Sequence, residues 1–168
     1  TYNELWSPHS SFARCNSLLT FKVGLYSMSE ANTPGQFFTA KISTVQLYNL
    51  IPYFSDLNPG IQYGVTQEQS QELWQLRAKH CYGYAVAPEG SGAYCGIAGV
   101  FMDFSPDPHF PYSSVAQIEF TAVRPGYPGA ALALYQHIKN DLRNRGVQAL
   151  VVPRQVSRNE IRARLYRL

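Results

Sequence analysis

A glycine-bearing turn that leads into a helix is the first feature of this sequence that could bind a ligand. Residues 124–129 read RPGYPG, and the residues after them have the apolar spacing of a helix. Free backbone N–H groups and the positive end of the dipole at a helix N-terminus bind anions, phosphate in particular. The turn matches neither GxGxxG nor GxxxxGK[ST], which excludes a dinucleotide-binding Rossmann site and a P-loop. The pattern therefore predicts a general anion site near residue 130.

Two polar residues interrupt the apolar segment just before this turn. Residues 115–123 (VAQIEFTAV) predict a strand, in which side chains alternate between two faces. Gln117 and Glu119 are two positions apart, so they share a face. A carboxylate at such a place can take part in proton transfer, whereas an amide cannot act as a base. The alternative interpretation is that Glu119 is a structural carboxylate whose hydrogen bonds are satisfied.

The cysteines and histidines do not form a metal-binding pattern. Cys15, Cys81 and Cys95 are odd in number and lack CxxC spacing, which argues against structural zinc and against a secreted disulfide framework. The four histidines lack ligand spacing such as HxxxH. We therefore expect no metal cofactor, and a reducing compartment such as the cytoplasm.

The composition fits one domain with an unusual surface. The chain has 168 residues, 45% of them apolar, and it has no apolar run long enough to predict a membrane span. Only 15% of the residues are charged, whereas 14% are aromatic, including twelve tyrosines. Globular domains average about 25% charged residues. Few charges and many tyrosines predict either a large apolar cleft or a surface that is buried in a protein partner or a homo-oligomer.

The positive charges are concentrated at one end of the chain. Residues 139–168 contain eight lysines and arginines against Asp141 and Glu160, whereas residues 1–138 contain six against nine acidic residues. A basic segment of this kind suits a phosphate-bearing ligand, nucleic acid or an acidic partner, although a solvated helix face is the alternative. Most tyrosines lie outside the segment, so only its charge supports binding to nucleic acid.

The elements that must position these residues alternate between strands and helices. We expect an extended N-terminal arm over residues 1–36, with a strand at 18–26, followed by one domain over residues 37–168. The first part of that domain is predicted to contain a strand at 37–42, a helix at 45–54 capped by Thr44, a helix at 67–79 started by Thr66, and a hairpin of strands at 81–87 and 93–104.

The second part is predicted to begin with a proline-rich loop at 105–112. The strand at 115–123, a helix at 130–145 and a buried strand at 147–152 form a βαβ unit. A last helix is expected from Ser157 or Asn159, with Ile161, Leu165 and Leu168 on one face. The fold class is therefore mixed α/β.

Several of these features together resemble one known superfamily. They are the run at 117–125 (QIEFTAVRP), the glycine turn, a helix ending at Arg145-Gly146, the strand at 147–152, and Asn159 followed by Leu165-Tyr166. This combination is similar to the acyl-CoA N-acyltransferases of the GNAT superfamily. The similarity covers residues 80–168, and the helices at 44–79 stand where the family has its first two. It implies a GNAT-like central sheet flanked by helices, with acyl-CoA in a gap between the fourth and fifth strands.

The resemblance also implies an activity and a set of site residues. The activity is transfer of an acetyl or other acyl group from acyl-CoA to an amine acceptor, by direct attack in a ternary complex. Glu119 would be the base, because Gln117 occupies the best-matching position, and Tyr166 would protonate the thiolate unless it is a core aromatic. Contacts to acetyl-CoA or another acyl-CoA are implied at Val123, Gly129, Ala130, Ala131, Ala133 and Asn159, with Arg154, Arg158, Arg162 and Arg164 near its 3′-phosphate.

The sequence departs from the family pattern in two places. The family's phosphate loop reads Gln/Arg-x-x-Gly-x-Gly/Ala, whereas Pro128 and Ala131 stand at its leading and central positions. Proline has no N–H and an alanine Cβ restricts close approach, although Ala130 and Ala131 keep their donors, so weaker binding is expected. The sequence also ends at Leu168, where the family continues with further strands. A GNAT-like domain without acyl-CoA chemistry, serving as a structural subunit of a virus particle (virion) or another assembly, is the alternative function.

Overall fold

Six strands form one sheet whose order follows the sequence. The computed structural model describes residues 36–103 and 112–168; the predicted strand at 18–26 and most of the proline-rich loop lie outside them. All neighbouring strands are antiparallel except β4 and β5, which are parallel. In order across the sheet, the strands are β1 (Phe37–Ile42), β2 (Tyr82–Pro88), β3 (Gly96–Asp103), β4 (Val115–Val123), β5 (Ala149–Ser157) and β6 (Glu160–Arg167).

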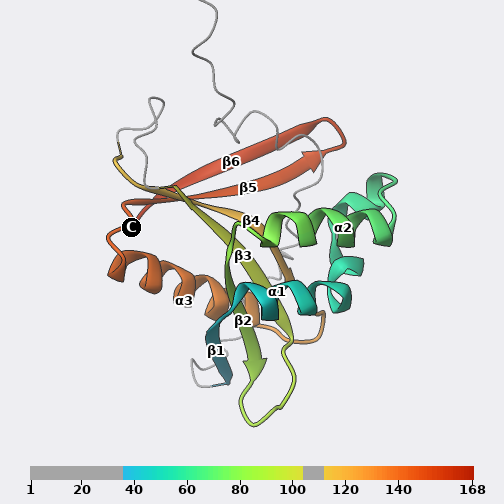
Figure 1. Cartoon of the computed structure of the whole chain (residues 1–168), viewed down its shortest axis with the longest axis horizontal. Coiled ribbons are helices and arrows are strands. Elements are labelled where there is room, and N and C mark those ends of the chain that lie inside the picture. The colour runs from blue at the N-terminus through green and yellow to red at the C-terminus, as the bar shows by residue number, and fades with distance from the viewer. Residues whose placement is uncertain (1–35, 104–111) are drawn as a thin grey trace, which may run out of the picture.

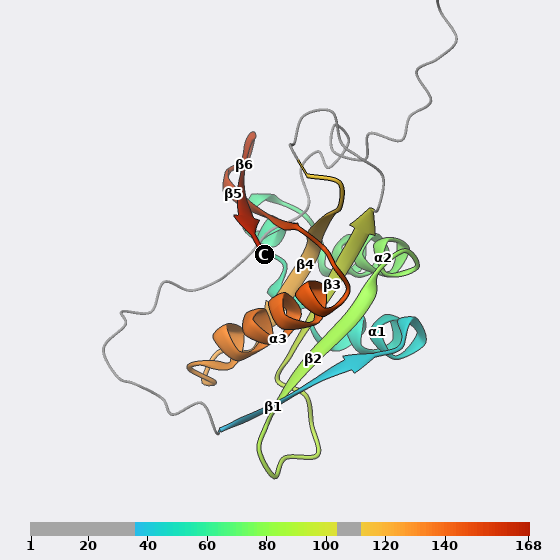
Figure 2. The same ribbon diagram turned by 90° about the vertical axis from the view of Figure 1, so that its left-hand side faces the viewer.

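Helices cover both faces of this sheet. Figure 2 shows α3 (Ala130–Asn144) on one face, and α1 (Thr44–Leu50) and α2 (Gln67–Ala78) on the other. Short 3₁₀ turns over residues 51–63 connect α1 to α2. The mixed α/β class, the hairpin of β2 and β3 and the βαβ unit are confirmed. Within the described ranges, no helix has the length and apolar character that a membrane crossing requires.

Capping boxes fix the starts of α1 and α2. Thr66 starts α2, as the sequence predicts: its side chain accepts a hydrogen bond from the Gln69 amide, and the Gln69 side chain accepts one from the Thr66 amide. In α1 the cap is Ser43, one residue before the predicted Thr44, and it pairs in the same way with Gln46. The predicted helix at 45–54 ends early because Pro52 begins a 3₁₀ turn.

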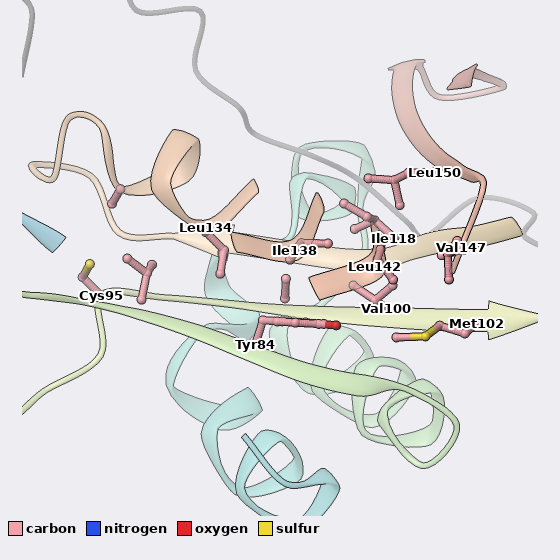
Figure 3. Close-up of a cluster of buried hydrophobic side chains, with 14 residues drawn as sticks. Tyr84, Cys95, Val100, Met102, Ile118, Leu134, Ile138, Leu142, Val147 and Leu150 are labelled. Carbon is pink, nitrogen blue, oxygen red and sulfur yellow. The ribbon is translucent and has the colours of Figure 1, made fainter. Parts of the chain in front are cut away.

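The core on the α3 side follows the helical spacing seen in the sequence. Leu134, Ile138 and Leu142 are fully buried at intervals of four residues along α3. Figure 3 shows them packed against Val100 of β3 and Ile118 of β4. This packing fixes α3 across the strands and so sets the position of its N-terminus.

The core on the opposite face is built on an aromatic stack. The rings of Trp74 and Phe120 lie 5.0 Å apart with an interplanar angle of 12°, and both side chains are fully buried. Gly99 makes room for this stack, since a Cβ there would lie 2.6 Å from Cε1 of Phe120. The stack therefore fixes α2 against β4.

The predicted last helix is wrong. Residues 160–167 form β6, which pairs antiparallel with β5 after a turn at residues 158–159. The apolar residues Ile161, Leu165 and Leu168 fit a helical period, but Ile161, Ala163 and Leu165 fit the two-residue period of a strand equally well. Periodicity cannot separate a helix from a strand in so short a segment. Pairing along β5 decides the outcome.

The aromatic stack gives a direct test of the fold. We expect Trp74→Ala to lower the free energy of unfolding by about 3–5 kcal/mol, because it removes a fully buried ring and opens a cavity beside Phe120. Leu76→Ala, in the same helix but 57% exposed, should change it by less than about 0.5 kcal/mol. Urea unfolding of both variants measures the difference, and equal losses would contradict this packing.

Candidate functional site

The sheet opens between β4 and β5. The two strands pair only over residues 115–117 of β4 and 149–151 of β5. β4 continues to Val123 and β5 to Ser157, and Figure 1 shows the β5–β6 hairpin turning away from the other strands. Beyond Gln117, the edge of β4 that faces β5 has no strand partner in the described part of the chain. On that side, the backbone N–H and C=O groups of Ile118 and of residues 120–123 pair with no described strand, so they need another hydrogen-bond partner.

A β-bulge in β4 stands beside this opening. Gly99 pairs with Phe120 while Val100 pairs with Ile118, so Glu119 is an extra residue in β4. Such a bulge re-aims side chains. Ile118 packs in the α3 core, whereas Glu119 and Phe120 both contact α2. Glu119 therefore lies on the α2 face of the sheet, where Gln117 also points.

Glu119 is a buried carboxylate that contacts Gln117 and Arg77 within the described part of the chain. It is 4% exposed, and Gln117 Nε2 donates a hydrogen bond of 3.1 Å to its Oε1. Arg77 of α2 lies 3.6 Å from Oε2. Burial raises the pKa of Glu119, and the Arg77 charge and the Gln117 hydrogen bond oppose that rise. A carboxylate with a raised pKa suits a general base near neutral pH.

The N-terminus of α3 lies where the sequence predicts an anion site. Gly129 has a φ of 88°, a left-handed conformation that favours glycine, and it leads the chain into the helix. The first turn of α3 contains no acidic residue, so the helix dipole there is not neutralised. The Ala133 amide donates to the Gly129 carbonyl at 2.9 Å. The amides of Ala131 and Leu132 have no acceptor within the helix.

One prediction about this turn needs a correction. The Ala130 amide does not remain open, because it donates a 3.2 Å hydrogen bond to the Tyr127 carbonyl. Gly129, Ala130, Ala131 and Ala133 are nevertheless brought together at one helix end. The amides of Ala131 and Leu132 are therefore the donors that an anion would meet.

Two buried hydroxyls lie on the α3 side of the opening. Thr121 of β4 and Tyr135 of α3 have buried side-chain oxygens, and the two hydroxyls are polar neighbours of each other. Burial raises the pKa of Tyr135, and a hydrogen bond with Thr121 opposes that rise. A hydroxyl both donates and accepts, so this pair can form further hydrogen bonds with a ligand.

The structure separates two of the predicted site residues from Glu119. Tyr166 lies in β6 opposite Leu150, with its ring 5.0 Å from Lys139 Nζ of α3, so it faces the α3 side. Asn159 lies in the turn between β5 and β6, and its amide donates to Ser157 Oγ at 3.3 Å. The helical arrangement of Asn159 and Tyr166 is thus wrong, for the reason given above. Val123 ends β4 at the edge of the α3 core.

Solved structures share this arrangement of sheet and helices. An aminoglycoside N-acetyltransferase, AAC(6′)-Iy, in complex with CoA is 12% identical, with a TM-score of 0.52 over 71% of this chain and 78% of that one. A GCN5-related N-acetyltransferase from Ralstonia eutropha JMP134 is 16% identical, with a TM-score of 0.51 over 69% and 82%. A possible acetyltransferase from Clostridium difficile 630 is 9% identical, with a TM-score of 0.54 over 73% and 82%.

The chain has the GNAT fold. No protein-family model matches the chain, and no curated protein matches it in sequence. At these identities the structural likeness shows the fold alone. The GNAT fold does account for the opening between β4 and β5, which the resemblance predicts.

Sequence reasoning missed three residues of this GNAT-fold site. Arg77 is in a polar helix whose sequence gives no sign that it reaches Glu119. Thr121 and Tyr135 are ordinary strand and helix residues in the sequence, and only the packing of α3 on β4 brings both to the opening. Both residues lie in elements that the sequence predicts, Thr121 in the strand at 115–123 and Tyr135 in the helix at 130–145.

The raised pKa of Glu119 predicts a pH dependence of stability. A carboxyl whose pKa is higher in the folded than in the unfolded chain stabilises the fold below its unfolded pKa, about 4.3, and this contribution is lost as pH rises through the folded pKa. We therefore expect the free energy of unfolding of Glu119→Gln, relative to the unchanged chain, to increase with pH and then level off.

Urea unfolding across acidic to neutral pH measures this difference. Glu72→Gln provides a control, because it removes an exposed carboxylate from α2, the helix whose Arg77 contacts Glu119. A relative stability of Glu119→Gln that stays constant or falls as pH rises would contradict the buried setting of Glu119.

Proposed function

We propose that this GNAT-fold domain transfers an acyl group from acyl-CoA to an amine. The observation that carries the proposal is the opening between β4 and β5, which lies between a buried carboxylate and an unneutralised helix N-terminus. An acyl-transfer site needs a place for phosphate, a channel for the acyl arm and a base for the amine. The described residues supply candidates for all three.

The α3 side of the opening has the chemistry that acyl-CoA requires. The amides of Ala131 and Leu132, with the helix dipole, would bind the pyrophosphate. The open edge of β4 carries backbone donors and acceptors that suit the amide groups of the pantetheine arm. Thr121 and Tyr135 add two neighbouring hydroxyls, each of which can both donate and accept hydrogen bonds. CoA is bound in the solved AAC(6′)-Iy structure, which supports this assignment.

The α2 side of the opening would receive the amine. Its nitrogen attacks the thioester carbonyl carbon, forming the N–C bond as the C–S bond breaks and the thiolate leaves. Glu119 accepts the proton that the attacking nitrogen loses, through a water molecule if the amine does not reach the carboxylate. Gln117 and Arg77 orient Glu119, and the Arg77 charge favours its ionised form.

A charge placed at the helix end tests the acyl-CoA site. We expect Ala131→Asp to weaken acetyl-CoA binding at least tenfold relative to Ala131→Asn, because a carboxylate there repels the pyrophosphate while the amide of similar shape does not. The same aspartate should not lower stability, since acidic residues favour a helix N-terminus. Calorimetric titration measures both affinities. Equal affinities, or no binding by the unchanged chain at millimolar acetyl-CoA, would contradict the proposal.

Loss of the base should affect turnover but not acyl-CoA binding. We expect Glu119→Gln to reduce the rate of CoA thiol release by about 10²- to 10⁴-fold with a panel of primary amines, at unchanged acetyl-CoA affinity. In the unchanged chain the rate should rise with pH as Glu119 ionises. Full activity of Glu119→Gln would show that Glu119 is not the base.

The predicted role of Tyr166 as the acid is tested separately. Because the Tyr166 side chain is 37% exposed and its ring packs on Lys139, we expect Tyr166→Phe to keep its turnover. A large fall in turnover with unchanged acetyl-CoA affinity would return Tyr166 to the mechanism as the group that protonates the thiolate.

A further inference from the structure

A basic surface on the β5–β6 hairpin takes no part in the proposed acyl transfer. Arg154 lies opposite Arg162, Arg164 lies opposite Val152, and Tyr166 lies opposite Leu150. Side chains two positions apart on a strand share a face, so the three arginines and Tyr166 project from one face of the hairpin. We call this set the arginine face: Arg154, Arg162, Arg164 and Tyr166, with Lys139 of α3 beside the Tyr166 ring.

The arginine face is open to solvent, whereas the other face of β5 is not. All four hairpin residues of the set are exposed. On the opposite face of β5, Val151, Pro153 and Gln155 are buried. The part of this face that carries the arginines is therefore free, whereas Leu150 and Val152 on the same face of β5 pack in the α3 core.

The positive charges on this face are not compensated within the described chain. Arg154 and Arg162 are direct cross-strand neighbours, an arrangement that destabilises a sheet unless an anion separates the charges. Glu160 is the acidic residue in contact with the set: its Oε1 accepts a 2.7 Å hydrogen bond from Arg162 Nε. Both partners are at least half exposed, so this pair is weak. Arg154 and Arg164 form no ion pair with any described residue.

The spacing of these groups suits a polymer. Alternate residues on β6 advance by about 6.7 Å, a distance on the scale of two successive phosphates of a nucleic-acid strand, paired or unpaired. Arg162, Arg164 and Tyr166 follow one another at this spacing. An aromatic ring in line with arginines provides a surface on which an unpaired base can stack. Bases within a duplex are already stacked on one another, so they cannot use this surface.

We propose that the arginine face binds single-stranded nucleic acid. Arg154, Arg162 and Arg164 contact phosphates, and Tyr166 stacks on a base while Lys139 adds a further positive charge. The proposal does not depend on the acyl-transfer activity, because Arg154, Arg162 and Arg164 belong neither to the opening beside Glu119 nor to the first turn of α3; Tyr166 is the member of the set that lies near Tyr135.

Fluorescence polarisation with labelled twelve-nucleotide oligo(U) and oligo(dT), and with a hairpin duplex, tests the proposal on the full chain. Four phosphate contacts predict an affinity that falls about 50-fold between 50 and 200 mM salt. Arg162→Gln/Arg164→Gln should reduce this fall to about sevenfold, because two contacts are lost. Tyr166→Leu should weaken binding at least about fivefold at every salt concentration.

A matched control distinguishes binding at the arginine face from an effect of net positive charge. Arg167→Gln/Lys79→Gln removes the same charge away from the arginine face, since Arg167 lies on the opposite face of β6 and Lys79 follows α2. It should keep most of the affinity and the full salt dependence. An equal loss in both double variants, or tighter binding to the duplex than to oligo(U) and oligo(dT), would overturn the proposal. Displacement by acetyl-CoA would also overturn it, because the arginines would then form a CoA phosphate subsite.

Discussion

The short parallel pairing of β4 and β5 is the constraint on which the rest of this structure depends. Three residue pairs join the strands, and both strands then continue apart. Backbone groups that lose their partners inside a protein must be satisfied by something else. The opening is therefore both the weak point of the sheet and the place where a ligand with amide and phosphate groups gains most.

Two separate cores keep this opening from closing. On one face, Leu134, Ile138 and Leu142 hold α3 across the strands, which places the N-terminus of α3 at the end of β4. On the other, the stack of Trp74 on Phe120 holds α2 over β4. The bulge at Glu119 lets one strand serve both cores, because Ile118 packs with α3 while Phe120 packs with α2.

The electrostatic character of the site follows from these layers. Glu119 is buried because α2 covers it, and Arg77 of the same helix keeps its ionised form accessible. The end of α3 stays electropositive because alanines and Leu132 fill its first turn. On the basic face of the hairpin, α3 covers Leu150 and contacts Tyr166 through Lys139, whereas Arg154, Arg162 and Arg164 remain in solvent.

How far the sequence predicts this molecule depends on how local each determinant is. Thr66 with Gln69, the strand at 115–123 and the apolar stripe of α3 are encoded by near neighbours, so the corresponding elements could be predicted. The segment after Ser157 could not, because its apolar spacing fits a helix and a strand equally well and only pairing with β5 decides between them. The contact of Arg77 with Glu119 joins residues 42 positions apart and follows from the tertiary packing alone.

The central claim is that acyl-CoA enters between β4 and β5 with its phosphates at the start of α3. Backbone NMR of the full chain during a titration with acetyl-CoA tests this most directly. The account predicts that the largest shifts of amide signals fall in residues 119–123 and 129–133, with smaller changes in α1. No shifts at millimolar acetyl-CoA, or shifts confined to the β5–β6 hairpin, would contradict it.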